Sequence, residues 1–78
     1  MSDKHKQLLL NVFTFIYNFM EKNKYTPSYE EIGDALNMSS AYISRLVSEL
    51  IEIGLLERPR DRALVLGKLS VNEWLNNI

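Results

Sequence analysis

The clearest structural signals in this chain of 78 residues lie in the stretch TPSYEEIGDALNMSSAYISRLVSELIEIG, residues 26–54. Its first half predicts a short helix. Pro27 keeps the preceding residue out of helical geometry, while Ser28 and Glu31 have the spacing of a capping box, in which each side chain hydrogen-bonds the other residue's backbone N–H. The predicted buried face of this helix consists of Ile32, Ala35 and Leu36. The helix is expected to end at residues 37–38.

The second half of the stretch predicts a longer helix that runs to about residue 53. Ser39 or Ser40 can cap its start, and Gly54 suits the left-handed conformation with which many helices end. Its expected core stripe consists of Ile43, Val47, Leu50 and Ile51, with Leu46 at the edge. Because the two helices are capped and joined by a tight turn, we predict a helix-turn-helix over residues 28–53.

Residues 3–22, before this stretch, predict a long first helix whose apolar residues recur at helical spacing. Its regular core positions are Leu8, Leu9, Val12, Phe13, Ile16, Phe19 and Met20. With Leu10, Phe15 and Tyr17 added, the apolar arc widens to roughly 220° at about 100° per residue. Because one small domain rarely covers so wide an arc by itself, we expect another surface to pack there.

After residue 54, the spacing of the apolar residues is no longer helical and becomes typical of short β-strands. Residues 55–58 and 62–66 flank a turn that contains a proline, which predicts a β-hairpin. Ser70 and Glu73 then repeat the capping-box pattern and start a terminal helix. The apolar face of this helix consists of Val71, Trp74, Leu75 and Ile78.

These elements predict one domain over residues 1–78, mainly α with a small β-hairpin. The architecture is a winged helix-turn-helix with a three-helix core, a two-stranded wing over residues 55–66 and an extra C-terminal helix over residues 70–78. The hydrophobic fraction of 46% is ample for a packed core and too high for a disordered chain.

Composition excludes several classes of function. The chain has no cysteine, which excludes disulfides and thiolate metal sites. The single histidine, His5, has no co-ligands at metal spacing, and we interpret it as a solvated residue of the first helical turn. We expect no metal, no cofactor and no enzymatic activity, because no phosphate-binding loop and no nucleophile with a histidine partner is present. With no secretory signal or bilayer-length apolar run visible, a cytoplasmic location is expected.

The start of the longer helix suits the major groove of DNA, where the second helix of a helix-turn-helix meets base edges with its N-terminal residues. Its candidate contacts are Ser39, Ser40, Ala41, Tyr42, Ser44, Arg45 and Ser48. Arg45 lies almost opposite Val47 around the helix, so it points outward and can make a bidentate contact to guanine. No acidic residue occurs from residue 37 to residue 48. The alternative is an ordinary solvated face, since serine-rich helix starts are common.

The wing adds three candidate contacts to the phosphate backbone or the minor groove: Arg58, Arg60 and Arg62. The alternative is charge that keeps a strand edge soluble. Ser28 completes the predicted DNA contacts. The net charge of −1 argues against a nonspecific nucleic-acid coat protein, but a site-specific binder depends on where its positive charges lie.

The run from residue 26 to residue 66 resembles the DNA-binding domain of LexA-type repressors and the wider winged-helix group that includes MarR-type regulators. The matching features, within about residues 8–66, are Pro27-Ser28, Glu31-Ile32, Ala35-Leu36, the Ser39 cap, Leu50, Gly54 with Leu55-Leu56, and the wing. The resemblance implies a transcriptional regulator that acts as a repressor on double-stranded DNA. It implies that the residues reading the bases are Ser39, Ala41, Tyr42, Ser44 and Arg45. The wing arginines would then contact the phosphate backbone of the DNA.

Two departures limit what the resemblance implies. The residues in the base-reading positions differ from those typical of LexA, so no operator sequence carries over. The sequence shows no counterpart of the self-cleaving C-terminal domain, so nothing in it implies proteolytic induction.

The resemblance to MarR-type regulators implies pairing through the first and last helices, and a two-fold protein matches a palindromic site. We therefore predict a homodimer. Its candidate contacts are Leu10, Phe15, Tyr17, Val71, Trp74, Leu75 and Ile78. The alternative is a last helix that folds back onto the first within one monomer. Two other functions stay open: a winged helix that binds protein, such as a phage or mobile-element factor acting on a host protein, and a DNA-binding accessory factor in replication or partition.

Overall fold

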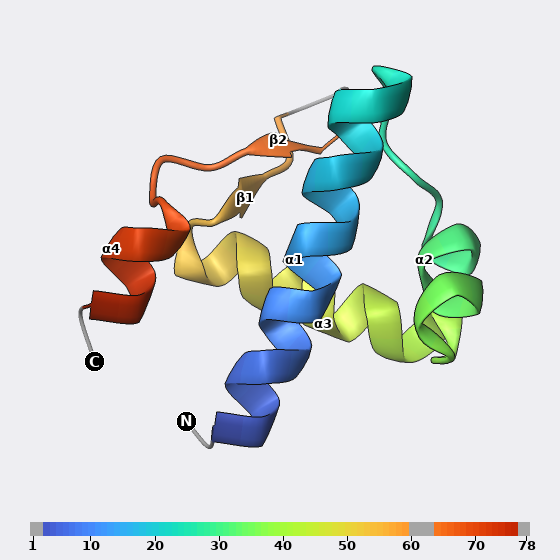
Figure 1. Cartoon of the computed structure of the whole chain (residues 1–78), viewed down its shortest axis with the longest axis horizontal. Coiled ribbons are helices and arrows are strands. Elements are labelled where there is room, and N and C mark those ends of the chain that lie inside the picture. Colours follow the sequence, from blue (N-terminus) through green and yellow to red (C-terminus); the bar gives the residue numbers. More distant parts are fainter. Residues whose placement is uncertain (1–2, 60–63, 77–78) are drawn as a thin grey trace.

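The computed structural model describes residues 3–59 and 64–76 of the chain. Its elements, in chain order, are α1 (Asp3–Asn23), α2 (Tyr29–Leu36), α3 (Ser40–Ile53), β1 (Leu56–Glu57), β2 (Val65–Leu66) and α4 (Val71–Asn76). α3 contacts α1, α2 and β1; α2 lies beside its beginning, while the hairpin and α4 lie toward its end (Figure 1). The fold is the winged helix-turn-helix that the sequence predicts.

The predicted caps of the helix-turn-helix are present. The Ser28 hydroxyl accepts a hydrogen bond from the backbone N–H of Glu31 at 3.0 Å, and the Glu31 carboxylate accepts one from the N–H of Ser28 at 3.0 Å. Ser39, and not Ser40, caps α3, because its hydroxyl accepts from the backbone N–H of Tyr42 at 3.1 Å. These bonds satisfy N–H groups that a helix start leaves unpaired, so they determine where both helices begin.

The turn between α2 and α3 is tight. Asn37 takes the left-handed conformation with a φ of 59°, and the N–H of Met38 donates to the carbonyl of Gly33 at 2.8 Å. This pattern satisfies a carbonyl at the end of α2 and reverses the chain within a few residues. α3 consequently starts directly beside the end of α2.

α3 ends at the predicted left-handed stop, Gly54, which has a φ of 102°. The N–H of Leu55 donates to the carbonyl of Leu50 at 3.0 Å, which completes this type of helix end. The chain then enters β1, which pairs with β2 in an antiparallel ladder. Its register is Leu56↔Leu66 and Glu57↔Val65. The strands are shorter than predicted, and residues 60–63, at the predicted tip of the wing, lie outside the described residues.

A single hydrophobic core joins the helices to the wing. Its buried side chains are Leu9, Val12, Phe13, Ile16, Ile32, Ile43, Leu46, Val47, Leu50, Leu55, Leu56, Leu64 and Trp74. Three predicted details of the core differ in the structure. Leu46 is 1% exposed and not at an edge, whereas Ile51 is only half-buried. In α2, Ala35 is exposed and Gly33 is buried. The burial of Leu46 follows from the central place of α3, which α1, α2 and β1 cover over a wider arc than one stripe.

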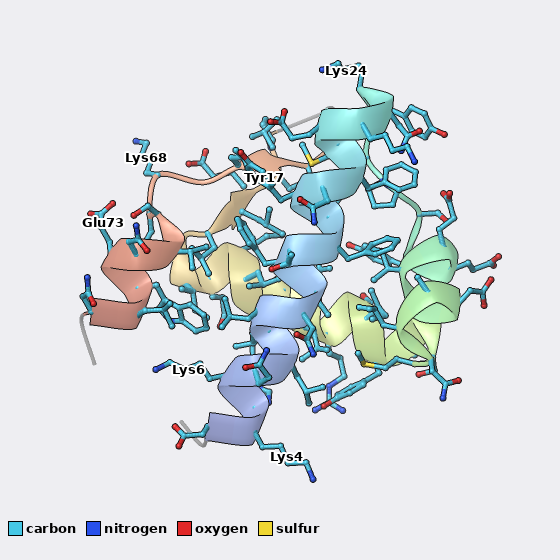
Figure 2. All side chains as sticks on the ribbon, in the orientation of Figure 1. Lys4, Lys6, Tyr17, Lys24, Lys68 and Glu73 are labelled. Carbon is cyan, nitrogen blue, oxygen red and sulfur yellow. The ribbon has the colours of Figure 1, made fainter. Side chains whose placement is uncertain are left out.

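α4 starts with its predicted capping box. The Ser70 N–H donates to the Glu73 carboxylate at 3.2 Å, and the Glu73 N–H donates to the Ser70 hydroxyl at 3.1 Å. Trp74 is 7% exposed and belongs to the core of its own chain, with the Lys6 ammonium 5.9 Å from its ring centre. Lys6 extends from α1 on the side of α4 (Figure 2). This placement matches the alternative in which the last helix packs within its own chain, and pairing through Trp74 stays a prediction.

The other predicted dimer contacts differ in exposure. Tyr17 and Leu75 are each 39% exposed, whereas Leu10, Phe15 and Val71 are half-buried against the core. Ile78 lies outside the described residues. None of the helices within residues 3–59 and 64–76 combines the length and the apolar character that crossing a membrane requires.

Candidate nucleic-acid interface

The first turns of α3 present small and polar side chains. Exposed among the predicted contacts are Ser39, Ser40, Ala41, Arg45 and Ser48. Tyr42 and Ser44 are half-buried, and the Tyr42 ring packs against the core. The Ser39 hydroxyl is already engaged in capping. Because most of these side chains are short, the backbone of α3 can approach a partner closely.

The starts of α2 and α3 border one open groove. Its lining residues are Ser28, Tyr29, Glu30, Ser40, Ala41 and Ser44. The structure thus brings the predicted Ser28 together with residues of α3. Backbone N–H groups at a helix start carry partial positive charge, which favours an anionic partner. The exposed carboxylate of Glu30 in the same groove opposes that preference.

Arg45 is exposed on the side of α3 that faces away from the core. Val47, about 200° further around the helix, is fully buried. Within the part of the chain that the structure describes, the Arg45 guanidinium forms no ion pair. The surface around it is lined by Ser44, Arg45, Ser48, Glu49 and Glu52. The planar guanidinium of Arg45 can therefore donate its N–H groups to an acceptor outside the chain.

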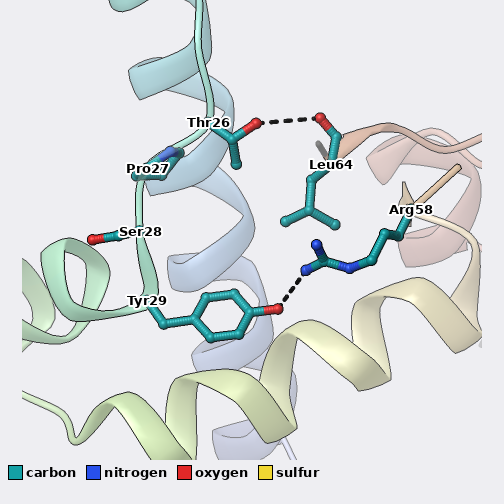
Figure 3. Close-up of a pocket in the computed structure, with 6 residues that line it drawn as sticks. All are labelled: Thr26, Pro27, Ser28, Tyr29, Arg58 and Leu64. Carbon is teal, nitrogen blue, oxygen red and sulfur yellow. Dashed lines mark hydrogen bonds between the residues drawn. The ribbon is translucent and has the colours of Figure 1, made fainter. Parts of the chain in front are cut away.

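The base of the wing is tied to the start of α2 (Figure 3). The guanidinium of Arg58 donates to the Tyr29 hydroxyl at 2.5 Å and lies 6.0 Å from the centre of that ring. The Thr26 hydroxyl donates to the carbonyl of Leu64 at 3.4 Å. Arg58 stays exposed and its partner is neutral, so its positive charge remains at the surface. The other predicted wing contacts lie outside the described residues: Arg60 and Arg62.

Two contacts at this surface have no signal in the sequence. One joins Tyr29 to Arg58, and the other joins His5 to Glu49, whose carboxylate oxygens lie 2.9 and 2.8 Å from His5 Nε2. The second contact corrects the interpretation of His5 as a solvated residue. The partners stand 29 and 44 positions apart, so no helical spacing relates them. Among the described residues, His, Asp and Glu side chains form no group of three that could hold a metal ion.

Comparison with known proteins gives one family and a set of similar repressors. The family model described as "LexA DNA binding domain" matches residues 5–63. A LexA repressor of Gluconobacter oxydans (strain 621H) is 39% identical over 72 residues, which cover 91% of this chain and 29% of that protein. A LexA repressor of Pelagibacter ubique (strain HTCC1062) is 38% identical over 81 residues, which cover 100% of this chain and 34% of that protein. The chain thus spans about a third of these relatives' length. No solved structure matches at a comparable level of significance.

Proposed function

The chain belongs to the LexA DNA-binding domain family, and on that basis we propose that it binds double-stranded DNA of a defined sequence and represses transcription by occupying an operator. One observation carries the proposal. Arg45 is exposed, and has no ion-pair partner among the described residues, on a serine-lined start of the second helix of a helix-turn-helix. A cytoplasmic location, beside the chromosome, is part of the proposal.

In the proposed complex, the first turns of α3 enter the major groove. Ser40 and Ser44 are small enough to let the helix approach, and Arg45 donates two hydrogen bonds to O6 and N7 of a guanine. A backbone phosphate lies at the start of α2, beside Ser28. Arg58, held by Tyr29, contacts another phosphate from the base of the wing.

Binding to a duplex is expected to weaken steeply as salt rises, because each phosphate that the protein neutralises releases counterions. Arg58→Ala should lower the slope of log affinity against log salt concentration by about one unit. The measurement is a series of fluorescence-anisotropy titrations, at several salt concentrations, with a duplex selected from a random pool.

Lys68→Ala is the matched control for this series. It removes an exposed positive charge from the segment between β2 and α4, far from α2 (Figure 2), and should leave the slope unchanged. A slope that Arg58→Ala does not alter would contradict the phosphate contact. Binding that is absent, or insensitive to salt, for every duplex would favour a winged helix that binds protein.

We propose further that two copies occupy the operator together, since a two-fold dimer matches a palindromic site. Among the predicted dimer contacts, Tyr17 and Leu75 leave the most apolar surface exposed, at 39% each. Light scattering at high micromolar concentration is expected to give twice the chain mass of 9.1 kDa. Tyr17→Glu should return the mass to that of a monomer, whereas Tyr25→Glu, which charges a 61% exposed ring outside the predicted face, should not. A monomer mass for the unmodified chain would refute the dimer.

A further inference from the structure

We infer that His5 is a positioning residue for DNA binding: it holds the carboxylate of Glu49 toward α1 and thereby leaves Arg45 free to reach the duplex. The inference rests on the proposed function, because it concerns the arginine that is proposed to read a base. It assigns a role to a contact between α1 and α3 that neither the capping pattern nor the hydrophobic core requires.

Glu49 is the carboxylate best placed to pair with Arg45 along α3. It follows Arg45 by four residues, so both side chains leave the helix on one face, one turn apart. Both also line the same stretch of surface. An arginine and a carboxylate at this spacing form an ion pair, and the planar guanidinium favours two parallel hydrogen bonds to the carboxylate. Such a pair would occupy the N–H donors that a guanine needs and offset the positive charge beside the phosphates.

The structure pairs Glu49 with His5 instead. Nε2 of His5 lies 2.9 and 2.8 Å from the two carboxylate oxygens. Because an ionised carboxylate only accepts hydrogen bonds, Nε2 carries the hydrogen and donates it. The two side chains are 33% and 39% exposed, so the contact stands at the surface where α1 crosses α3. Within residues 3–59 and 64–76, Arg45 is left with no carboxylate partner.

Removing the imidazole should redirect Glu49 to Arg45. We expect His5→Ala to raise the dissociation constant of the selected duplex about two- to fivefold, because the competing Arg45–Glu49 pair would be a single ion pair at an exposed surface. Glu49→Gln removes the competing charge and should bind at least as tightly as the unmodified chain. The double variant His5→Ala/Glu49→Gln should then bind as tightly as Glu49→Gln alone. His5→Gln keeps an N–H donor and should bind like the unmodified chain.

A purely structural role for His5 predicts a different result for the double variant. If His5 only held α1 against α3, the double variant would bind as weakly as His5→Ala, because both lack that contact. This outcome, or unchanged binding by His5→Ala, would overturn the inference. Gln7→Ala is the matched control, since the Gln7 amide is exposed on α1 and donates to Asn11 of the same helix at 2.9 Å. Thermal unfolding followed by circular dichroism establishes that each variant is folded.

The same titrations separate this inference from the proposed function. Failure of the unmodified chain to bind any duplex overturns the proposed function and the inference with it. Equal binding by the unmodified chain and His5→Ala overturns the inference alone. Restored binding in the double variant supports both, because the effect of His5 then depends on the charge at residue 49.

Discussion

Replacement of Arg45 by alanine is expected to cost about 1–3 kcal/mol of binding free energy to the selected duplex, roughly a 5- to 150-fold loss of affinity. The guanidinium is exposed and forms no ion pair with the described residues. Binding to guanine therefore breaks no such pair, and the variant loses the full value of the contact with the base. Because a bidentate contact reads one base pair, the loss should appear as lost preference at one position of each half-site.

Parallel selections from a random duplex pool, with the unmodified chain and with Arg45→Ala, measure this preference directly. Arg45→Lys is the informative control. It keeps the positive charge but loses the planar pair of donors, so it should retain affinity for unrelated duplexes while losing the same single preference. A preference that Arg45→Ala leaves intact would place base reading elsewhere on α3.

Short sequence patterns predict well where the helices of this chain begin and end. Ser28 with Glu31, and Ser70 with Glu73, form the capping boxes expected from their spacing. Gly54 ends α3 in the left-handed conformation. Each of these features depends on residues within one or two helical turns, and hydrogen bonds over such short separations leave a direct trace in the sequence.

Burial on α3 was predicted less well, because it depends on how many elements meet there. A single stripe would leave Leu46 at an edge, yet it is 1% exposed between the elements that pack around α3. Ile51, counted in that stripe, is only half-buried. A helix at the centre of three neighbours buries a wider arc than helical periodicity alone indicates.

The candidate interface shows the same division between local and distant contacts. The exposure of Arg45 follows from its angle to Val47 within one helix, so the sequence predicts it. The contacts from His5 to Glu49 and from Arg58 to Tyr29 depend on how separate elements cross, which no spacing encodes. The charge available at the interface is thus decided partly by pairs that only the tertiary structure reveals.

The tight turn of the helix-turn-helix depends on the missing side chain of Gly33. A Cβ at this position would lie 2.4 Å from the carbonyl oxygen of Met38, an atom of the backbone that cannot rotate away. Alanine would stabilise the interior of α2 by about 1 kcal/mol over glycine, whereas overpacking against a fixed atom costs about 1–3 kcal/mol and sometimes more. The clash should dominate, because the Met38 N–H is also bonded to the Gly33 carbonyl at 2.8 Å, so relief must move the turn itself.

Gly33→Ala is therefore expected to lower the free energy of unfolding by about 1–2 kcal/mol, which corresponds to roughly 4–16 °C in Tm for a domain of this size. Thermal unfolding followed by circular dichroism measures the change. Asp34→Ala, at an exposed position of the same helix, is the matched control and should stay within about 0.5 kcal/mol of the unmodified chain. Since the turn sets where α3 begins relative to α2, Gly33→Ala should also weaken duplex binding at temperatures where it is fully folded. If the variant is as stable as Asp34→Ala and binds DNA normally, the turn accommodates a methyl group and its close approach does not set the position of α3.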